Sequence, residues 1–350
     1  MDKLSVILLF FLLFLPLTRA QDNEQKQSID YLDPVIEKLQ WGDLKLGGWI
    51  RYEYHFKDYG EEDTRGGDFH FAGFTLKLSY DDGKFLADSA YRFFHFDSQN
   101  YWASFPEYAY AGYRFDDKSE LHLGIHIVPF GILTYNSFNY FESLGWPMGL
   151  EDNNDLGIKY IKDIGQWNLQ VAYYLSDEGN YFGRSSDSSR YSADVVRDNG
   201  IKNEEQHQGN FRLAYTWNVN KDLTVKPGIS LQYGGIHNDS TDDTGSLLAY
   251  AIHINSKYKR WQLMLQAARY KYNLRNPPGQ SEDIVQMGNY DSSYFQAARG
   301  RLYTASLGYT LPVNKWKIDS ITFYVDYGYL DKDKHSFTSS QLLVPGMMIK

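Results

Sequence analysis

Large apolar residues and polar residues alternate along most of this chain with a period of two. In the segment GNFRLAYTWNV, residues 209–219, one set of alternate positions is apolar and the other is mostly polar: Phe211, Leu213, Tyr215, Trp217 and Val219 against Asn210, Arg212, Thr216 and Asn218. Successive side chains of a β-strand point to opposite faces of the sheet. The pattern therefore predicts strands with one apolar face and one polar face.

The connections between these segments indicate the kind of sheet. The alternating segments are 44–56, 69–80, 84–96, 104–115, 119–130, 155–162, 166–175, 209–219, 222–236, 247–258, 260–273, 301–311, 315–330 and one that begins at 343. The short turns lie at 81–83, 116–118, 163–165, 220–221, 259–260 and 312–314, and they alternate with long stretches at 57–68, 97–103, 131–154, 176–208, 237–246, 274–300 and 331–342. A transmembrane barrel has its short turns at one end and its long loops at the other, whereas a soluble sandwich has crossing connections. We predict an all-β, transmembrane, up-and-down antiparallel β-barrel with its apolar face toward lipid.

The strand count leads to an expectation about barrel size. Single-chain bacterial barrels have an even number of strands. The last segment, LLVPGMMIK, follows a long loop and lacks a closing aromatic residue. We expect a sixteen-stranded barrel whose last two strands lie beyond Lys350, about fourteen being present; the alternative is a complete fourteen-stranded barrel.

The N-terminus has the features of a secretory signal. Residues 1–20 contain Lys3, an apolar run from Leu4 to Leu15, the helix breaker Pro16 and the small residue Ala20. An N-terminal anchor helix is the alternative. Residues 21–43 then form a lead-in with a short helix, and 44–350 form the barrel. An exported barrel protein is expected in the outer membrane of a Gram-negative bacterium, in contact with its lipids.

Composition narrows the partners. The net charge is −9 and no basic block occurs, which argues against nucleic acid as a partner. The chain has no Cys, so no disulfide supports the fold. Beyond the N-terminus no apolar run approaches the roughly 20 residues of a spanning helix.

The alternation along each strand places a set of charged residues on the inner face of the barrel wall. They are Lys45, Arg51, Glu53, His55, Asp88, Arg92, Glu120, His122, His126, Arg212 and Lys226. Small residues share this face, which favours a wide, water-filled interior. The alternation slips near Ala72–Gly73 and Arg269–Tyr270, where we expect bulges or strand ends.

The third long loop, 131–154, is the candidate pore constriction. It contains no Lys or Arg but is rich in aromatic and acidic residues, with one more acid just beyond it: Tyr135, Phe138, Tyr140, Phe141, Glu142, Trp146, Glu151, Asp152 and Asp155. Aromatic rings stack on sugars, and acids repel anions. The alternative is that these rings pack the loop against the inner wall.

No catalytic, metal or cofactor site is expected. His122 and His126 share one strand face but are too far apart to ligate one ion without another partner. The acidic run at 152–155 lacks the ligand spacing of an EF-hand loop.

Two stretches resemble a known family. HLGIHIVPFG (122–131) and GLEDNNDLGIKY (149–160), preceded by YAYAGYRFDDKSELHLG (108–124), are similar to the phosphate-selective porin O/P-like family of outer-membrane porins. The resemblance covers most of 44–330 and implies a sixteen-stranded, trimeric barrel with a selective pore. Phosphate-selective members use Arg and Lys in the constriction, whereas the matching loop here is acidic and aromatic.

These observations predict a non-enzymatic porin for passive diffusion of small hydrophilic solutes, with sugars or short oligosaccharides preferred. An anion- or phosphate-selective porin is the alternative and requires Arg51, Arg92, Arg212 and Lys226 to converge at the narrowest point. An outer-membrane hydrolase and a purely structural barrel are the remaining hypotheses.

Overall fold

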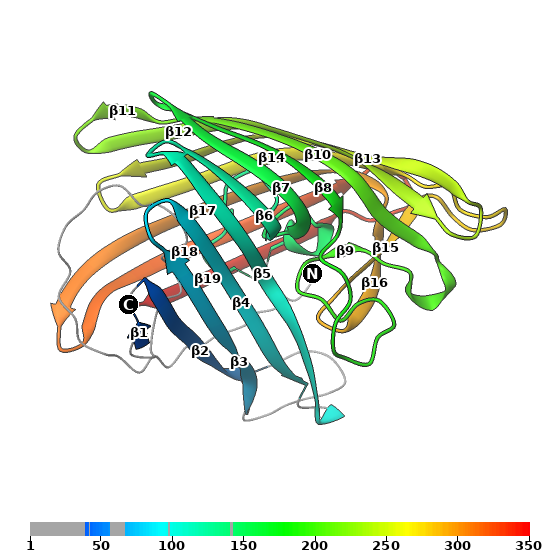
Figure 1. Cartoon of the computed structure of the whole chain (residues 1–350), viewed down its shortest axis with the longest axis horizontal. Coiled ribbons are helices and arrows are strands. Elements are labelled where there is room, and N and C mark those ends of the chain that lie inside the picture. The colour runs from blue at the N-terminus through cyan, green and yellow to red at the C-terminus, as the bar shows by residue number, and fades with distance from the viewer. Residues whose placement is uncertain (1–38, 42, 57–66, 97–98, 141–142) are drawn as a thin grey trace.

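The computed structural model describes the chain except for residues 1–38, 42, 57–66, 97–98 and 141–142 (Figure 1). The expected signal segment and the expected lead-in helix therefore lie outside the described residues, apart from 39–41, which form a short strand. Within the described part, no helix has the length and hydropathy needed to cross a membrane.

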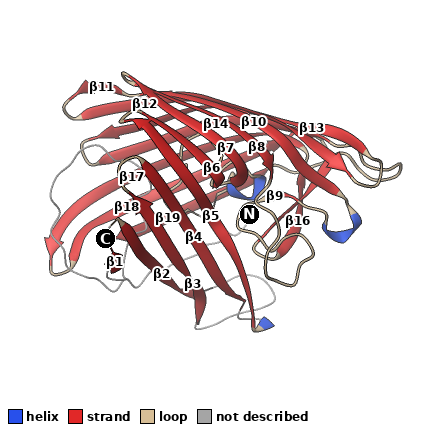
Figure 2. Cartoon of the chain, viewed as in Figure 1, coloured by secondary structure: helices blue, strands red, loops and turns tan. Residues whose placement is uncertain are grey.

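Nearly all regular structure is β (Figure 2). The strands of the main sheet are β1 (Leu39–Trp41), β2 (Leu44–His55), β3 (Asp68–Asp81), β4 (Phe85–Phe96), β5 (Tyr101–Asp116), β6 (Ser119–Ile127), β7 (Asn154–Ile164), β8 (Trp167–Ser176), β10 (Asn203–Tyr215), β11 (Trp217–Asn220), β12 (Leu223–Asn238), β13 (Asp243–Tyr258), β14 (Trp261–Asn273), β17 (Arg299–Lys315), β18 (Ile318–Lys332) and β19 (Ser340–Ile349). The other elements are β9 (Asp194–Val195), β15 (Ile284–Asn289), β16 (Ser292–Ala297) and the 3-10 helices η2 (Trp146–Met148) and η3 (Asp198–Gly200).

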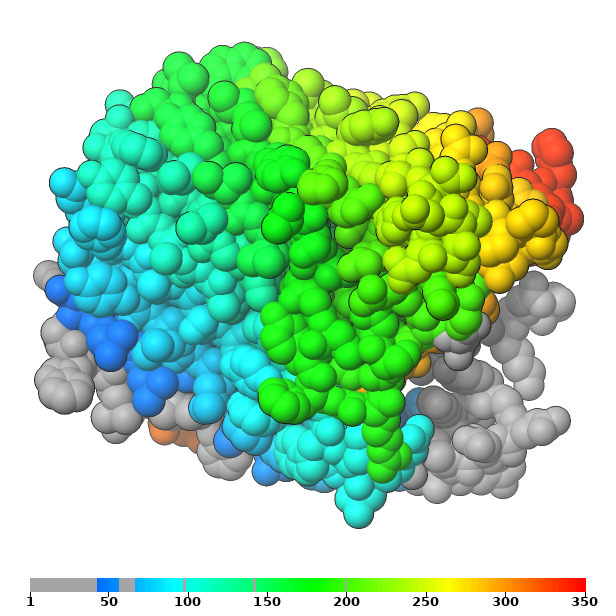
Figure 3. All heavy atoms as spheres, turned by 45° about the vertical axis from the view of Figure 1, so that its right-hand side comes forward, coloured from blue at the N-terminus to red at the C-terminus, as the bar shows by residue number. Residues whose placement is uncertain are grey.

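The main sheet has an up-and-down order. Each strand pairs antiparallel with the next main-sheet strand along the chain, from β1 to β19, while β11 pairs with β12. In Figure 3, successive parts of the chain follow one another across the visible surface, from blue through green to yellow. The predicted all-β, up-and-down antiparallel fold is confirmed. Among the described residues, β1 and β19 are the two ends of this order.

Short turns and long loops alternate as expected, but some loops are shorter than the sequence pattern predicted. The loop expected over 237–246 is reduced to 239–242, because β12 and β13 continue their pairing out to Asn238 and Asp243. The stretch expected over 176–208 shortens to 177–202, since β10 already begins at Asn203.

The polarity of the two sheet faces is the reverse of that in a soluble protein. Phe211, Leu231 and Ile254 are 36%, 46% and 40% exposed, whereas Gln232 and His253 are 1% and 4% exposed. A continuous apolar outer face of this kind is stable only in apolar surroundings, and an apolar band facing outward is the signature of a transmembrane barrel. The prediction that the apolar face points outward is therefore confirmed.

Of the two expected irregularities, one occurs. A register shift between Arg51 and Tyr52 leaves Ala72 as an extra residue on β3, a bulge. The expectation at Arg269–Tyr270 is wrong, because β14 pairs with β17 there without a shift. The side chain of Tyr270 points to the inner face, as the alternation requires. A large aromatic residue occurs there because the wall at this point faces packed protein rather than water.

Burial of the inner face increases from the short turns toward the long loops. On β13, Lys257 and Asn255 are partly exposed, whereas Ala251 and Ala249 are buried. Strands β12, β17 and β18 show the same change along their length. The interior is therefore open at the short-turn end and filled at the long-loop end.

Three inserted segments fill that end: 128–153, 177–202 and 274–298. The second and third contribute β9, β15 and β16, which form a small separate sheet. Their apolar residues join wall residues in one buried cluster, which includes Met148, Leu150, Val195, Val285, Met287, Ala249, Ala251, Ala268, Tyr270 and Tyr272. The small inner residues expected to border water thus provide room for protein over this half of the wall.

Candidate functional site: the inserted loop and the inner wall

The segment 128–153 crosses the interior. It leaves β6, yet the backbone N–H of Gly131 donates to Ser230 Oγ on β12 (2.9 Å) and that of Ile132 donates to Gln266 Oε1 on β14 (3.0 Å). Because β12 and β14 are far from β6 in the sheet order, these bonds require the loop to span the enclosed space.

Asp326 on β18 anchors the middle of the loop. Its Oδ2 accepts hydrogen bonds from the backbone N–H of Phe138 (2.9 Å) and Asn139 (3.0 Å) and from Asn139 Nδ2 (2.8 Å). Nearby, Ser306 Oγ donates to the carbonyl of Asn136 (2.9 Å). The remaining hollow beside Asn136 and Asp326 measures about 10 Å³, room for about one water molecule.

Four aromatic rings of the loop contact other aromatic rings. Tyr135 and Tyr140 meet edge to face with centroids 4.7 Å apart, and Phe138 stacks on Tyr324 of β18 at 5.6 Å. Trp146 meets Tyr290 of the third inserted segment at 5.6 Å. Two of the expected constriction residues, Phe141 and Glu142, lie outside the described residues.

The acids of the loop are buried and hydrogen-bonded. Glu151 is 4% exposed and accepts from the backbone N–H of Asn136 (2.8 Å) and from the hydroxyl of Ser143, and burial raises its pKa to about 7. Asp152 is also 4% exposed and accepts from the Tyr191 hydroxyl, and burial raises its pKa well above the usual value. Neither carboxylate borders open water, so the acidic field expected from this loop is largely enclosed.

Two of the wall arginines are neutralised by wall carboxylates. Arg51 forms an ion pair with Glu53. Arg92 is 2% exposed and donates from Nε to Glu107 (2.7 Å). Its guanidinium lies 4.5 Å from the ring centroid of Tyr191, so this cation is buried within the fold.

A second basic group lies on β10, β12 and β13. Arg212 donates to the carbonyl of Gly131 (2.7 Å) and so holds the root of the loop. In the sheet register, Arg212 lies opposite Ser230, and the same inner face carries Lys226, His253 and Lys257 toward the short turns. The four basic residues expected to converge for an anion filter are thus divided between two places.

The other predicted wall residues also lie on the inner face. Lys45 is exposed, His55, Asp88 and Glu120 are partly buried, and His122 and His126 are buried. His122 stacks on Tyr110 with centroids 4.6 Å apart and contacts Glu120 through Nε2 (3.1 Å). The Nδ1 atom of His126 lies 3.1 Å from the Tyr174 hydroxyl.

One group of three wall residues presents atoms of the kind that bind metals. Glu53 Oε2 lies 2.8 Å from His55 Nε2 and 3.2 Å from His70 Nε2. The same carboxylate pairs with Arg51 through its other oxygen. Hydrogen bonds and this ion pair account for the arrangement.

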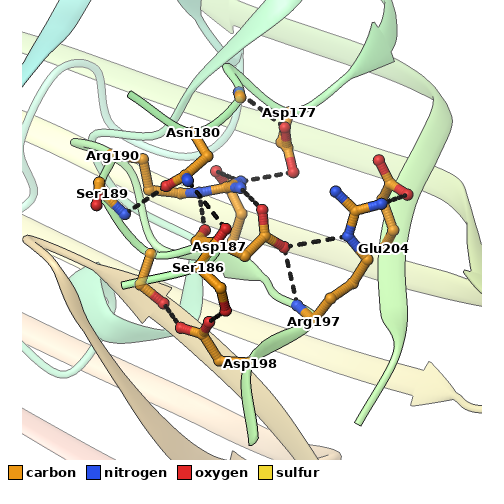
Figure 4. A network of polar contacts seen from close by, with 12 residues as sticks. Asp177, Asn180, Ser186, Asp187, Ser189, Arg190, Arg197, Asp198 and Glu204 are labelled. Atoms are coloured by element: carbon orange, nitrogen blue, oxygen red, sulfur yellow. Dashed lines mark hydrogen bonds and ion pairs between the residues drawn. The ribbon is translucent and has the colours of Figure 1, made fainter. Parts of the chain in front are cut away.

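The segment 177–202 contains a buried polar network around Arg190 that the alternation pattern does not indicate. Arg190 is 1% exposed and pairs with Asp177 (2.5 Å) and Asp187 (3.0 Å), and Asp187 also accepts from Arg197 (Figure 4). The sequence signal was the apolar residues Tyr191, Ala193, Val195 and Val196 inside an otherwise polar stretch, which indicate a packed segment.

The fold and the face polarity place the chain in the class of transmembrane-type, up-and-down β-sheet proteins. No protein-family model matches the chain, and no curated protein matches it. Among solved structures, the outer-membrane channel DcaP of Acinetobacter baumannii is similar at 11% identity and a TM-score of 0.49, with 87% of this chain and 96% of that chain covered. OmpT of Vibrio cholerae is similar at 9% identity and a TM-score of 0.44, with 90% of this chain and 100% of that chain covered. The anion-selective porin from Comamonas acidovorans is similar at 13% identity and a TM-score of 0.37, with 87% of this chain and 97% of that chain covered. These values describe a distant likeness.

Proposed function

We propose that this protein is an outer-membrane porin through which small hydrophilic solutes diffuse passively, with neutral polar solutes such as sugars or short oligosaccharides preferred. The observation that carries the proposal is the face polarity of the sheet: the outer face is apolar and exposed, and the inner face is polar and partly exposed toward the short turns. In a bilayer, this arrangement gives a lipid-compatible outer surface and a hydrated inner wall. A cleaved signal, a location in a Gram-negative outer membrane and a homotrimeric state belong to the same proposal.

The inserted loop is proposed as the constriction. It is supported by the backbone bonds to β12 and β14 and by the three bonds to Asp326, which hold it across the interior. Because Glu151 and Asp152 are enclosed, the loop offers aromatic edges, hydroxyls and amides more than net charge. Such a lining suits neutral polar solutes.

Liposome swelling tests the proposal. Vesicles containing the folded protein should swell in isotonic solutions of small sugars, and the rate should fall as the sugar size increases. Vesicles prepared with heat-denatured protein are the control. An absence of swelling with every sugar would contradict a diffusion porin and favour a structural barrel.

The second basic group supports a different form of the anion-channel alternative, one that does not include Arg51 and Arg92. Arg212, Lys226 and Lys257 share the inner face of neighbouring strands toward the open end of the interior. Under a salt gradient, an anion channel would give a reversal potential whose sign is set by anion flow. The double change Lys226→Gln with Lys257→Gln should reduce the size of this potential. The exposed turn residue Lys118 provides the control, Lys118→Gln. A reversal potential near zero would favour neutral solutes.

A further inference from the structure

A group of buried carboxylates lies at the long-loop end of the interior. Asp155 comes from β7, Glu178 from the segment after β8 and Asp194 from β9, and they are 2%, 3% and 0% exposed. Each offers one carboxylate oxygen, and these three atoms lie within 4.8 Å of one another. Three elements of the chain thus bring acidic groups to one enclosed point.

Neighbouring positive charge compensates only part of the charge of this group. Arg190 forms ion pairs with Asp194 (3.3 Å), Asp177 (2.5 Å) and Asp187, so its single charge is shared among three carboxylates. Burial of an ionised carboxylate without a partner is costly.

Two carboxylate oxygens of this group lack a hydrogen-bond partner. Asp155 Oδ2 accepts from Gln208 Nε2 (3.2 Å), and Glu178 Oε1 accepts from the backbone N–H of Ser192 (2.6 Å). Their other oxygens, Asp155 Oδ1 and Glu178 Oε2, are buried and have no hydrogen-bond partner.

Asn153, which contacts Asp194 through its side-chain nitrogen, also has a buried oxygen without a partner. Asn153 is 5% exposed, its Nδ2 donates to Asp194 (3.2 Å), and its Oδ1 has no hydrogen-bond partner. A neutral amide oxygen carries no proton to share with a carboxylate, so it requires a donor or a cation. Buried oxygens without a donor, close to several negative charges, are typical of a cation site.

We propose that Asp155, Glu178 and Asp194, with the amide oxygen of Asn153, bind one Ca²⁺ ion that joins the inserted segments to β7. All four side chains offer oxygen, the ligand atom that Ca²⁺ takes. The ligands come from strands and loops of irregular spacing, which Ca²⁺ accepts more readily than Mg²⁺, because Mg²⁺ requires near-ideal octahedral geometry. The ion neutralises the buried charge and fixes the ends of the first and second inserted segments.

Calorimetric titration of the full chain tests this site. The protein is folded in detergent, freed of metal with a chelator and titrated with CaCl₂ or MgCl₂ at neutral pH. We expect one Ca²⁺ per chain, with Mg²⁺ at least about tenfold weaker. Asp155→Asn combined with Glu178→Gln keeps the side-chain sizes and removes two ligand charges, so Ca²⁺ affinity should fall at least about tenfold.

The control carries the same chemical changes on the surface. Asp242 is 99% exposed and Glu282 is exposed, and Asp242→Asn with Glu282→Gln should leave Ca²⁺ binding unchanged. Absence of Ca²⁺ binding to the native chain, or equal binding by the two double variants, would overturn the proposal.

Hydrogen exchange of backbone amides in the native chain provides a second test, which does not depend on the folding of the site variant. The N–H of Ser192, which donates to Glu178, should exchange more slowly in Ca²⁺ than in chelator. Equal exchange in the two solutions would also overturn the proposal.

Discussion

At the scale of single residues, Phe138 and Asp326 fix the inserted loop to the wall opposite its origin. Asp326 binds two backbone N–H groups of the loop, and the ring of Phe138 stacks on Tyr324 directly over Gly308. A Cβ atom at position 308 would meet the Phe138 ring, so the absence of a side chain there allows the close approach. The loop position depends on these few contacts.

Replacement of Phe138 by Ala is expected to loosen the loop. The lost ring contacts should cost about 2 to 3 kcal/mol, less than for a fully buried Phe, because this ring is partly exposed. Single-channel conductance in planar bilayers should rise. Phe323→Ala removes a ring from the outer face of β18, the strand that carries Tyr324, and is the control, since Phe323 is 49% exposed. Equal conductance of the two variants would contradict the packing role of Phe138.

Glu151 is expected to make loop docking depend on pH. Its pKa in the folded protein is about 7, above the ordinary value of 4.5, so ionisation opposes the docked state. Docking should be most stable below pH 4.5 and should weaken as the pH rises toward 7. After correction for intrinsic rates, amides of the loop should exchange at least about tenfold more slowly at pH 5 than at pH 8.

The Glu151→Gln variant should reduce this difference, and Asp152, whose pKa is also raised, should supply the remainder. The exposed Glu282→Gln change is the control and should leave it intact. A native loop with the same protection at both pH values would be evidence against this role of Glu151.

At the scale of elements, each strand presents a lipid face and an inner face, and the two faces should differ in their tolerance of charge. Ile252 lies in the middle of β13 and is 64% exposed on the outer face. Ile252→Arg should destabilise the folded protein in vesicles by about 2–4 kcal/mol, the cost of Arg near the bilayer midplane. Urea titration of folding into lipid vesicles measures this cost.

The matched control places the same residue on the inner face. Thr224 on β12 is partly exposed in the open part of the interior, and Thr224→Arg should cost little. Equal destabilisation by the two changes would show that the outer face of β13 does not meet hydrocarbon.

The strands were predictable because alternation is a local property of the sequence. Each segment from 44 to 330 has strand structure at its place, with errors of a few residues at its ends, but 209–219 is divided at Thr216 between β10 and β11. Phe211, Gln232 and His253 have the predicted directions. The ends of β10 and β12 were missed where polar residues such as Asn203 and Asn238 continue the pairing. At Tyr270, the inner face becomes apolar, so the local pattern suggested an irregularity that does not exist.

The site was less predictable because it depends on contacts between segments far apart in the chain. The composition of 131–154 identified an aromatic and acidic loop, but not that Glu151 would bind Asn136 and Ser143 within the loop. Arg190 was missed, because its carboxylate partners come together only after 177–202 folds inside the sheet. Alternation assigns a residue to a face but does not identify its partner across the interior.

At the scale of the whole molecule, the inserted segments determine how much of the interior is available to water. Excision of residues 134–147, with a short Gly-Ser linker in their place, should raise single-channel conductance severalfold. The inner residues now covered by the excised stretch, such as Thr304 and Ser306, would then border solvent. Removal of the exposed residues 334–336 from the loop between β18 and β19 is the control and should leave the conductance unchanged. A loop-excised protein with native conductance would exclude the segment as the constriction.

The change in burial along β13 has a consequence for electrical behaviour. The open part of the interior carries Lys226 and Lys257, whereas the opposite part is narrowed by protein. A funnel with charged walls at its wide mouth concentrates mobile counter-ions for one sign of applied voltage and depletes them for the other. Current through the protein should therefore rectify, and Lys226→Gln with Lys257→Gln should bring the current–voltage curve close to a straight line.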